Sequence, residues 1–403
     1  MKLAIYFNHY QTLGHTTRVI TLLKGLKEQF GPKVKILIFH SGKKNIFNLK
    51  KYGKVIDLPF SLDKRWFNLQ LRFRLDIWSV KLYGLENFLK KRLSIMKKEL
   101  NKFKPDIFIS EYYPFGKEFW AFELEFILEF LKKAFNTRIF SSVGYPFFMK
   151  DTAKIFNYYY DGVFFHYLRD EMFQYIKFLR QIKTTVDLKE LEGFLKKFAN
   201  KIYYTGYLIE KKRLKEPCQI RKKLGLDLNR KLVVVSRGGG VVRNDIIIQS
   251  IKAAKILKKV FFLISAGPAT SLDEFKYFKT LANLCNNVRL VLFLENFEDY
   301  LNAADLSINM AGYNTIVRLL WLKKQSLTIP LVSNIGNVEQ EWRAKLIEKF
   351  GLFKVLNEKY LNLEVFLNNI RKMLKEPLLA NNLINRLSFE GKENTLKIFK
   401  CLT

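Results

Sequence analysis

The chain repeats one pattern in both halves, in which a short run of β-forming residues is followed by a longer amphipathic stretch. The first half predicts strands at residues 3–7, 34–39, 55–58, 106–111, 138–143 and 162–167. The second half predicts strands at residues 232–236, 260–265, 288–293, 306–310, 326–330 and 353–356. Strands that alternate with helices form parallel sheets. We therefore predict an α/β protein built from two doubly wound, Rossmann-like domains.

A polar, lysine-rich segment separates the two series. It follows Tyr207 and contains Pro217, and the alternation restarts at Leu232. We predict domains at residues 1–208 and 209–403, each of ordinary size for one domain. Such domains bind ligands at the carboxyl ends of their strands, so we expect the functional site there, in a cleft that the two domains face.

The charge balance favours anionic partners but does not show which kind. There are 70 Lys and Arg residues against 37 Asp and Glu, a formal charge of +33. Such a field attracts nucleic acid, an acidic lipid surface or phosphorylated substrates, while solvated lysine faces without a partner are the alternative. Residues 65–104 hold 11 Lys or Arg against three acids, interleaved with aromatic residues. This pattern is typical of a helix on a membrane surface or of a helix packed on the sheet by its aromatic residues.

Cysteine spacing and the N-terminal residues predict a cytoplasmic protein. Cys218, Cys285 and Cys401 have the spacing of neither a disulfide framework nor a zinc site. Residues 1–7 have the character of a first strand and lead to no cleavage site. No apolar run reaches the roughly 18 residues that a membrane-spanning helix needs.

Three loops with glycine each follow a predicted strand. Their glycines are Gly14, the run Gly238, Gly239 and Gly240 after Arg237, and Gly312. Glycine lets the backbone approach a ligand at a helix N-terminus, an arrangement that suits a diphosphate. Ordinary βα turns are the alternative. None of the loops is a P-loop, and Gly14 lacks the further glycines of a dinucleotide fingerprint, so neither ATP in a P-loop nor NAD is expected.

Two side chains are candidates for proton transfer. His15 opens the first predicted helix, where the helix dipole lowers the pKa of an imidazole and keeps it neutral. It is the best placed of the four histidines, because it lies beside a glycine after the first strand. Glu111 ends a predicted strand and is the second acid or base candidate, with a helix cap or an ion pair as its structural alternative.

Short motifs are distributed over nearly the whole chain, at residues 14–18, 111–117, 123–124, 204–207, 238–240, 311–315 and 339–344. Together they resemble the MurG-like glycosyltransferases of unassigned substrate. This resemblance implies a GT-B fold, with an acceptor-binding N-terminal domain and a C-terminal domain that holds a nucleotide-sugar donor. It also implies a last helix that crosses back to the N-terminal domain.

The resemblance implies roles for single residues. His15 is the candidate base, the backbone near Leu294 is expected to meet the nucleobase, and the glycine loops are expected to hold the diphosphate. Glu339 and Gln340 are expected to meet the sugar hydroxyls. The candidate donor-binding residues are Gly14, Arg237, Gly238, Gly239, Gly240, Leu294, Gly312, Tyr313, Asn314, Thr315, Arg318, Glu339 and Gln340.

Arg318 departs from the family pattern, which has an acid in this helix to bind the ribose. A guanidinium donates hydrogen bonds and accepts none, so it is no substitute for a carboxylate at a diol. We predict that Arg318 meets an additional anionic group of the donor, or that it pairs with a neighbouring acid such as Glu295, Glu339 or Glu341.

The sequence therefore predicts an inverting glycosyltransferase that transfers a sugar from a nucleotide-diphosphate donor to an acceptor hydroxyl, on a lipid-linked or cell-envelope molecule. His15 or Glu111 would remove the acceptor proton. Neither a metal nor a cofactor is expected, since no D-x-D pair lies in a loop. An anionic membrane surface is an expected partner and nucleic acid is not, while no pattern indicates an oligomeric state. A nucleotide-sugar hydrolase or epimerase, and a non-catalytic basic binding protein of the same fold, are the alternatives.

Overall fold

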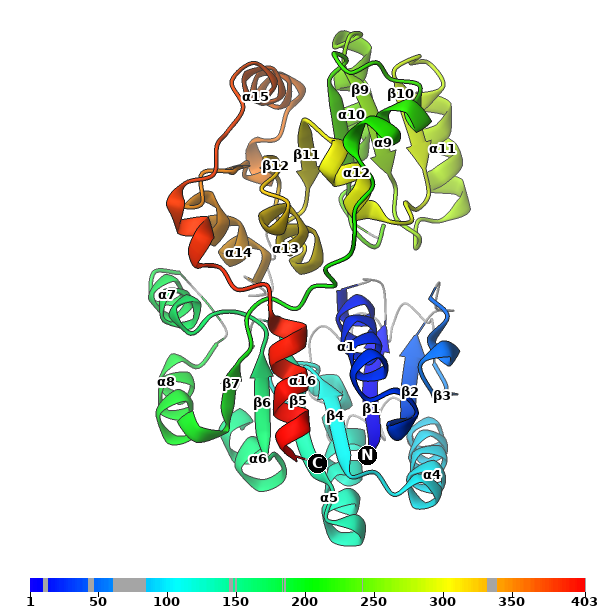
Figure 1. The fold of residues 1–403 in the computed structure, drawn as a ribbon, viewed down its shortest axis with the longest axis vertical. Helices are drawn as coiled ribbons and strands as arrows, with labels where there is room; N and C mark the ends of the chain where they lie inside the picture. Colours follow the sequence, from blue (N-terminus) through cyan, green and yellow to red (C-terminus); the bar gives the residue numbers. More distant parts are fainter. Residues whose placement is uncertain are drawn as a thin grey trace. The chain divides into compact units, whose positions relative to one another are not determined.

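The chain forms two compact units. The computed structural model describes residues 1–9, 14–42, 47–60, 85–144, 148, 151–182, 184, 186–240, 242–331 and 339–402. The first unit contains Met1–Tyr10, His15–Leu208 and Ser388–Thr403, and the second contains Gln11–Gly14 and Ile209–Leu387. Each unit holds one sheet whose strand pairs are all parallel (Figure 1). The predicted α/β class, with two doubly wound sheets, is confirmed.

The first sheet has the order β3-β2-β1-β4-β5-β6-β7. Its strands are β1 (Lys2–His9), β2 (Lys35–Gly42), β3 (Lys54–Asp57), β4 (Ile107–Glu111), β5 (Arg138–Val143), β6 (Gly162–Phe165) and β7 (Ile202–Tyr204). The order reverses between β1 and β4, and a reversal of this kind is where doubly wound folds bind their ligands. Strand β7 was not predicted from the sequence.

Helices cover both faces of this sheet (Figure 1). They are α1 (Gly14–Phe30), α4 (Glu86–Phe103), α5 (Ala121–Phe135), α6 (Thr152–Tyr159), α7 (Arg169–Leu179), α8 (Leu188–Lys197) and α16 (Gly391–Leu402). Short 3-10 turns lie at Gly31–Lys33, Leu49–Lys51, Glu118–Trp120 and Ala199–Lys201. On one face, Val19 and Leu22 of α1 share a core with Leu396 and Phe399 of α16. The end of the chain thus completes the core of the first unit.

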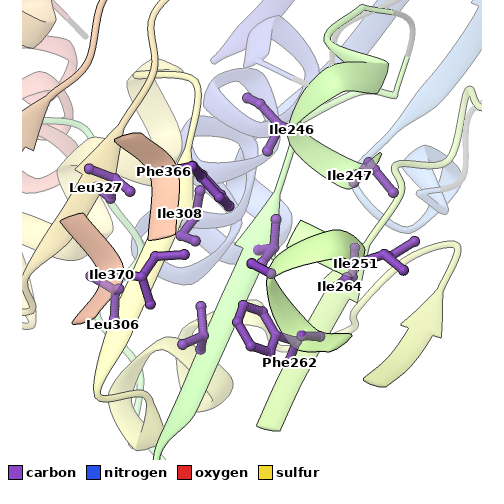
Figure 2. Packing of buried hydrophobic residues seen from close by; sticks show 14 of the residues in the cluster. Ile246, Ile247, Ile251, Phe262, Ile264, Leu306, Ile308, Leu327, Phe366 and Ile370 are labelled. Atoms are coloured by element: carbon purple, nitrogen blue, oxygen red, sulfur yellow. The ribbon is translucent and has the colours of Figure 1, made fainter. Parts of the chain in front are cut away.

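The second sheet has the order β10-β9-β8-β11-β12-β13. Its strands are β8 (Leu232–Ser236), β9 (Phe261–Ser265), β10 (Val288–Val291), β11 (Leu306–Asn309), β12 (Ser326–Thr328) and β13 (Phe353–Val355). Its helices are α9 (Pro217–Leu224), α10 (Asn244–Ile256), α11 (Leu272–Ala282), α12 (Phe297–Ala303), α13 (Tyr313–Trp321), α14 (Glu339–Glu348) and α15 (Leu363–Lys375), with 3-10 turns at Glu358–Tyr360 and Asn382–Arg386. Figure 2 shows the core, in which Ile246 of α10 and Phe366 of α15 pack over Ile264 and Ile308.

Two backbone segments of the first unit, 205–208 and 388–391, are joined by hydrogen bonds. The Tyr207 amide donates to the Ser388 carbonyl (2.8 Å), and the Gly391 amide donates to the Tyr207 carbonyl (3.1 Å). Gly206 has φ +80°, and a Cβ there would lie 2.8 Å from the Ser388 carbonyl oxygen. Glycine at 206 is therefore required by both its backbone angle and this close approach.

The lysine-rich stretch 65–104 is only partly described, since residues 61–84 lie outside the described residues. Helix α4 packs Leu89, Met96 and Leu100 inward and exposes Lys90 and Lys98. This part of the stretch is therefore a packed helix with solvated lysines, and its contact with a membrane stays a prediction. Among the described residues, no helix combines the length and the hydropathy that crossing a membrane takes.

Candidate functional site

His15, Arg18 and Glu111 form a cluster at the carboxyl edge of the first sheet. Glu111 is the last residue of β4, and His15 and Arg18 lie about one turn apart at the start of α1. The Nδ1 atom of His15 is 3.2 Å from Oε1 of Glu111. Arg18 donates to the same oxygen from Nε (3.0 Å) and from Nη2 (2.5 Å). The two residues predicted separately as proton-transfer candidates are thus in direct contact.

Charge and burial set the ionisation of this cluster. Burial would raise the pKa of Glu111, but the charge of Arg18 and the hydrogen bonds from His15 and Arg18 hold that pKa at about 2. Burial lowers the pKa of His15 to about 4, and the charge of Lys117 acts in the same direction. The predicted direction for His15 is confirmed, but the main cause is burial and not the helix dipole. At neutral pH the pair is a neutral imidazole beside a carboxylate.

The proton on His15 has two positions. Nδ1 lies 3.2 Å from Glu111 Oε1 and 3.1 Å from Arg18 Nη2. A carboxylate only accepts, so pairing with Glu111 places the hydrogen on Nδ1 and leaves the lone pair on Nε2. Pairing with Arg18 instead places the hydrogen on Nε2. The first tautomer is the one that can accept a proton from a substrate hydroxyl.

The loop after Glu111 is fixed against the sheet. Phe115 is fully buried and its ring lies 5.3 Å from that of Phe194 and 5.4 Å from that of Phe165. Tyr112, at φ +79°, turns its ring edge-on to His15 with 5.2 Å between the ring centres. The loop therefore supports the imidazole from a rigid base, as a proton-transfer group requires.

Two other histidines, His166 and His40, have different surroundings. His166 is fully buried, with Nε2 3.0 Å from the Ser142 hydroxyl and Nδ1 2.9 Å from the Thr205 hydroxyl. Burial lowers the pKa of His166 to about 3. His40 pairs through Nδ1 with Asp57 at 3.0 Å. His166 thus links three neighbouring strand ends within the protein, and His40 links two, which are structural roles.

In the second unit, two loops pack against each other through glycines. Gly240 has φ +92°, and a Cβ there would lie 2.7 Å from the Ala266 carbonyl oxygen and 2.8 Å from that of Gly267. The Ala269 amide donates to the Gly239 carbonyl at 2.9 Å. The Gly267 loop was missed in the sequence because it holds one glycine and no motif. Gly240 is needed by the fold itself, whatever else its loop binds.

Arg237 holds these two loops together. Its Nε donates to the Ala266 carbonyl (2.8 Å), its Nη2 to the Thr270 hydroxyl (3.0 Å), and its Nη1 to Asn244. Only 2% of Arg237 is exposed. The side chain of Arg237 thus bonds to groups within the protein. A contact of Arg237, Gly238 or Gly239 with a donor stays a prediction.

Gly312 differs from Gly240 because the protein does not need a glycine there. It precedes α13 with φ −62° and ψ 137°, angles open to any residue, and a Cβ would have no atom within 4 Å. No side chain caps this end of α13, which begins with Tyr313, Asn314 and Thr315. A helix N-terminus that no side chain caps, with open space beside it, suits an anionic ligand.

Helix α14 braces the turn before Gly312. Arg343 donates to the Ala311 carbonyl (2.6 Å), pairs with Glu339 and lies over the Tyr313 ring at 5.6 Å. Ala311 is held at φ +61°, in the left-handed region. Gln340 accepts a hydrogen bond from the Leu331 amide at 3.2 Å. Glu339 and Gln340 thus have partners within the protein, and their contact with sugar hydroxyls stays a prediction.

Of two further predicted residues, Leu294 lies shortly after β10 and Arg318 lies in α13. Leu294 is buried, while the preceding Leu292 and Phe293 are 40% and 38% exposed. Arg318 pairs through Nε with Glu298 of α12. The prediction that Arg318 has an acidic partner is confirmed, but the acids named for it, Glu295, Glu339 and Glu341, are not that partner. The fold brings Glu298 of α12 to Arg318 of α13, and the sequence does not show this contact.

Within the part of the chain that the structure describes, no group of three or more His, Cys, Asp or Glu side chains is arranged to hold a metal ion. Independence from metal stays a prediction.

Comparison with known proteins agrees with this geometry. Residues 232–394 match the glycosyltransferase family 28 C-terminal domain. The UDP-N-acetylglucosamine–N-acetylmuramyl-(pentapeptide) pyrophosphoryl-undecaprenol N-acetylglucosamine transferase of Caldicellulosiruptor saccharolyticus is 26% identical over 54% of this chain and 60% of its own length. The protein of the same name from Clostridium perfringens is 31% identical over 45% of this chain and 49% of its own. The chain thus spans about half to three fifths of these curated relatives. An uncharacterized glycosyltransferase of Methanosarcina acetivorans is 26% identical over 97% of this chain and 95% of its own.

Solved structures extend the likeness to both units. MurG of Acinetobacter baumannii has a TM-score of 0.55 at 11% identity and covers 99% of both chains. The spinosyn forosaminyltransferase SpnP has a TM-score of 0.62 at 13% identity, over 100% of this chain and 99% of its own. At these identities the likeness shows the fold, which is GT-B. The predicted resemblance to MurG-like glycosyltransferases is confirmed, and residues 232–394 match the family 28 type of C-terminal domain.

Proposed function

We propose that this protein is a glycosyltransferase that moves a sugar from a nucleotide-diphosphate donor to an acceptor hydroxyl with inversion. The observation that carries the proposal is the contact between His15 and Glu111 at 3.2 Å, at the carboxyl edge of the first sheet. The match of residues 232–394 to a glycosyltransferase domain supports the donor side.

In the proposed reaction, His15 is the general base. Its Nε2 takes the proton of the acceptor hydroxyl as the acceptor oxygen bonds to the anomeric carbon of the sugar. The bond from that carbon to the diphosphate oxygen breaks in the same displacement, which inverts the configuration. Glu111 fixes the tautomer and stabilises the imidazolium that forms, and Arg18 keeps Glu111 ionised.

The leaving diphosphate carries the charge that develops in this reaction. The N-terminus of α13, which no side chain caps, and the open space beside Gly312 suit that group. Fixed dipoles of this kind stabilise a developing charge without having to reorganise.

The acceptor is proposed to be a lipid-linked or cell-envelope molecule, met at the inner face of a membrane. The relatives named above are called transferases to a pyrophosphoryl-undecaprenol acceptor. The formal charge of +33 and the exposed lysines of α4 favour an anionic surface. Binding to anionic vesicles that high salt releases is expected. Equal partition to neutral vesicles, or salt-sensitive binding to DNA instead, would contradict this part of the proposal.

A nucleotide-sugar epimerase or hydrolase is the second candidate function. The UDP-GlcNAc 2-epimerases of Neisseria meningitidis and Methanocaldococcus jannaschii share the fold with TM-scores of 0.55 and 0.56. Turnover of a nucleotide sugar without any acceptor would favour this candidate, and turnover that depends on an acceptor favours the transferase.

A panel of UDP, GDP, dTDP, ADP and CDP tests the donor side by the shift of melting temperature. We expect one of them to stabilise the protein, and Gly312→Val to remove that shift while leaving the melting temperature of the free protein nearly unchanged. Gly193→Val in α8 is the matched control, since a Cβ at Gly193 also has no atom within 4 Å. If no nucleotide shifts the melting temperature at millimolar concentration, the transferase proposal fails.

A further inference from the structure

The guanidinium of Arg18 is confined by more than its pairing with Glu111. Its Nε and Nη2 atoms donate to Oε1 of Glu111, and its Cζ atom lies over the Tyr112 ring, 5.3 Å from the ring centre. The face of an aromatic ring attracts a cation in this position. Only 3% of Arg18 is exposed. Glu111 thus fixes one edge of the guanidinium, and Tyr112 fixes one of its faces.

Gly144 lies at the Nη1 end of the same guanidinium. It directly follows β5, the strand beside β4, and it is buried. A Cβ at Gly144 would lie 3.3 Å from Nη1 of Arg18, 3.8 Å from its Cζ and 3.5 Å from the Tyr112 hydroxyl oxygen. A separation of 3.3 Å is closer than most Cβ contacts in proteins, so the guanidinium would have to move. Arg18 therefore takes its place only because residue 144 has no side chain.

The backbone at Gly144 does not itself require glycine. Its φ is not positive, whereas Gly206 and Gly240 have φ +80° and +92°. The atoms that a Cβ would meet also differ. At Gly206 and Gly240 they include backbone carbonyl oxygens, and at Gly144 they belong to the side chains of Arg18 and Tyr112. Gly206 and Gly240 are thus needed by the fold, whereas Gly144 makes room for the cluster at the edge of the first sheet.

Tyr112 is held in an unusual conformation within this arrangement. Its φ of +79° is uncommon for any residue other than glycine and is strained for a bulky one. The Tyr112 amide donates to the Ser142 carbonyl at 3.0 Å, and the Tyr112 carbonyl accepts from the Phe115 amide at 2.7 Å. These bonds keep the ring beside both His15 and Arg18. Strain of this kind is concentrated at functional sites.

We propose that Gly144 is a positioning residue for the transfer reaction. The space that it leaves admits the Arg18 guanidinium, and Arg18 in turn holds Glu111 and His15 in the geometry of the general base. This inference rests on the proposed function and adds a residue that acts on the base only through Arg18. A side chain at residue 144 should therefore change the base and not the binding of the donor.

A displaced Arg18 changes the charge around His15. Burial is the main cause that lowers the pKa of His15 to about 4, and the charges of Lys117 and Arg18 act in the same direction, against Glu111. These three are the charged groups that face His15 within the described residues, from its own helix, from β4 and from the loop after β4. Moving Arg18 away removes one of the two positive charges, so the pKa of His15 should rise.

The first test follows the titration of the His15 imidazole by NMR in the free, full chain, so that it needs no substrate. Gly144→Val should raise the pKa of His15 from about 4 toward the 6.5 of a free side chain. Arg18→Met has no guanidinium to displace. Adding Gly144→Val to it should therefore leave the pKa of His15 where Arg18→Met alone puts it, the non-additivity expected of two residues in contact.

Gly162→Ala is the matched control. Gly162 is also a buried glycine of the first sheet without a positive φ, and a Cβ there would lie 2.8 Å from the Tyr203 ring and 2.9 Å from the Phe140 ring. This variant should lower the melting temperature and leave the pKa of His15 unchanged. Gly144→Ala, which adds a single carbon, repeats the test with a smaller shift if Gly144→Val does not fold.

The second test is turnover, with UDP-N-acetylglucosamine, the donor in the names of the relatives above, as the probe. Gly144→Val should lower kcat by about 10- to 100-fold, the cost of a misplaced catalytic group, and leave KM for the donor nearly unchanged. The inference is overturned if Gly144→Val keeps the wild-type pKa of His15, or raises it equally with and without Arg18. A wild type that turns over no nucleotide sugar would overturn the proposed function alone, and the titration would still decide the role of Gly144.

Discussion

Among its described residues, the first unit contains two buried arginine–glutamate pairs, and only one of them is complete. Arg92 of α4 binds both oxygens of Glu123, at 2.5 and 2.8 Å. Its remaining donors reach the Ser41 hydroxyl (2.8 Å), the Pro59 carbonyl (2.6 Å) and the Tyr6 hydroxyl (3.3 Å). All five N–H groups of the guanidinium are thus used. Such a pair holds α4 and α5 to the sheet and leaves nothing for a ligand.

The pair of Arg18 and Glu111 is organised differently. Arg18 directs both Nε and Nη2 to Oε1 of Glu111, and the buried Oε2 has no hydrogen-bond partner. An unpaired buried acceptor costs about 1–3 kcal/mol. His15 shares the same Oε1. A buried ion pair by itself thus indicates a structural role. A pair that leaves one oxygen without a partner and also contacts a neutral histidine indicates a catalytic role.

The largest effect is expected at the incomplete pair. His15→Gln removes the proposed base and should lower kcat by about 10²–10⁴-fold, the usual contribution of general-base catalysis. Its melting temperature should stay close to that of the wild type, because His15 is at the edge of the fold. Acceptor-dependent release of the nucleoside diphosphate measures the rate. Full activity in this variant would contradict the catalytic role given to the pair of Arg18 and Glu111.

The complete pair should behave in the opposite way. Arg92→Met leaves the charge of Glu123 buried without its partner, and should lower the free energy of unfolding by about 3–5 kcal/mol. The activity of the molecules that remain folded should not change. Arg180→Met, which breaks the exposed pair of Arg180 and Glu192, is the control and should cost at most about 1 kcal/mol. Urea unfolding measures both. A small loss in Arg92→Met would contradict the structural role.

Acid should act on the incomplete pair through His15. The pKa of His15 is about 4 in the folded protein against 6.5 for the free side chain. The unfolded chain therefore binds the proton first, so stability falls as the pH drops through 6.5 and continues to fall until about 4. Between pH 8 and pH 5 this costs about 2 kcal/mol. The loss of unfolding free energy between pH 8 and pH 5 should be smaller in His15→Gln than in the wild type, by about the same 2 kcal/mol. Urea unfolding at the two pH values measures this difference. Parallel losses in the two proteins would contradict the pKa.

Most of the sheet framework was predictable because each strand is a local signal. Residues 138–143 and 232–236 form strands with the predicted bounds. The predicted ends at Met310 and Pro330 lie one and two residues beyond the strands. The sequence stays apolar beyond each strand, but the backbone there no longer pairs with the neighbouring strands.

The site was predictable as residue types and not as contacts. His15 and Glu111 are 96 positions apart, and only the order of the strands brings them together. The same limit applies to Arg318, since Glu298 lies 20 positions away and the acids named for it lie 21 to 23 positions away, so that only the fold chooses between them. Gly240 and Gly312 look alike in the sequence, and only the neighbouring Gly267 loop shows that the first is needed by the fold.

The position of α16 has a consequence for biosynthesis. Leu396 and Phe399 belong to the core that Val19 and Leu22 form on the first sheet, yet they are translated after the whole second unit. A nascent chain that has emerged only as far as residue 208 therefore exposes an apolar groove on α1 and the sheet. The first unit can therefore complete its core only after the second has been made, and until then the apolar residues that α16 covers stay exposed to aggregation.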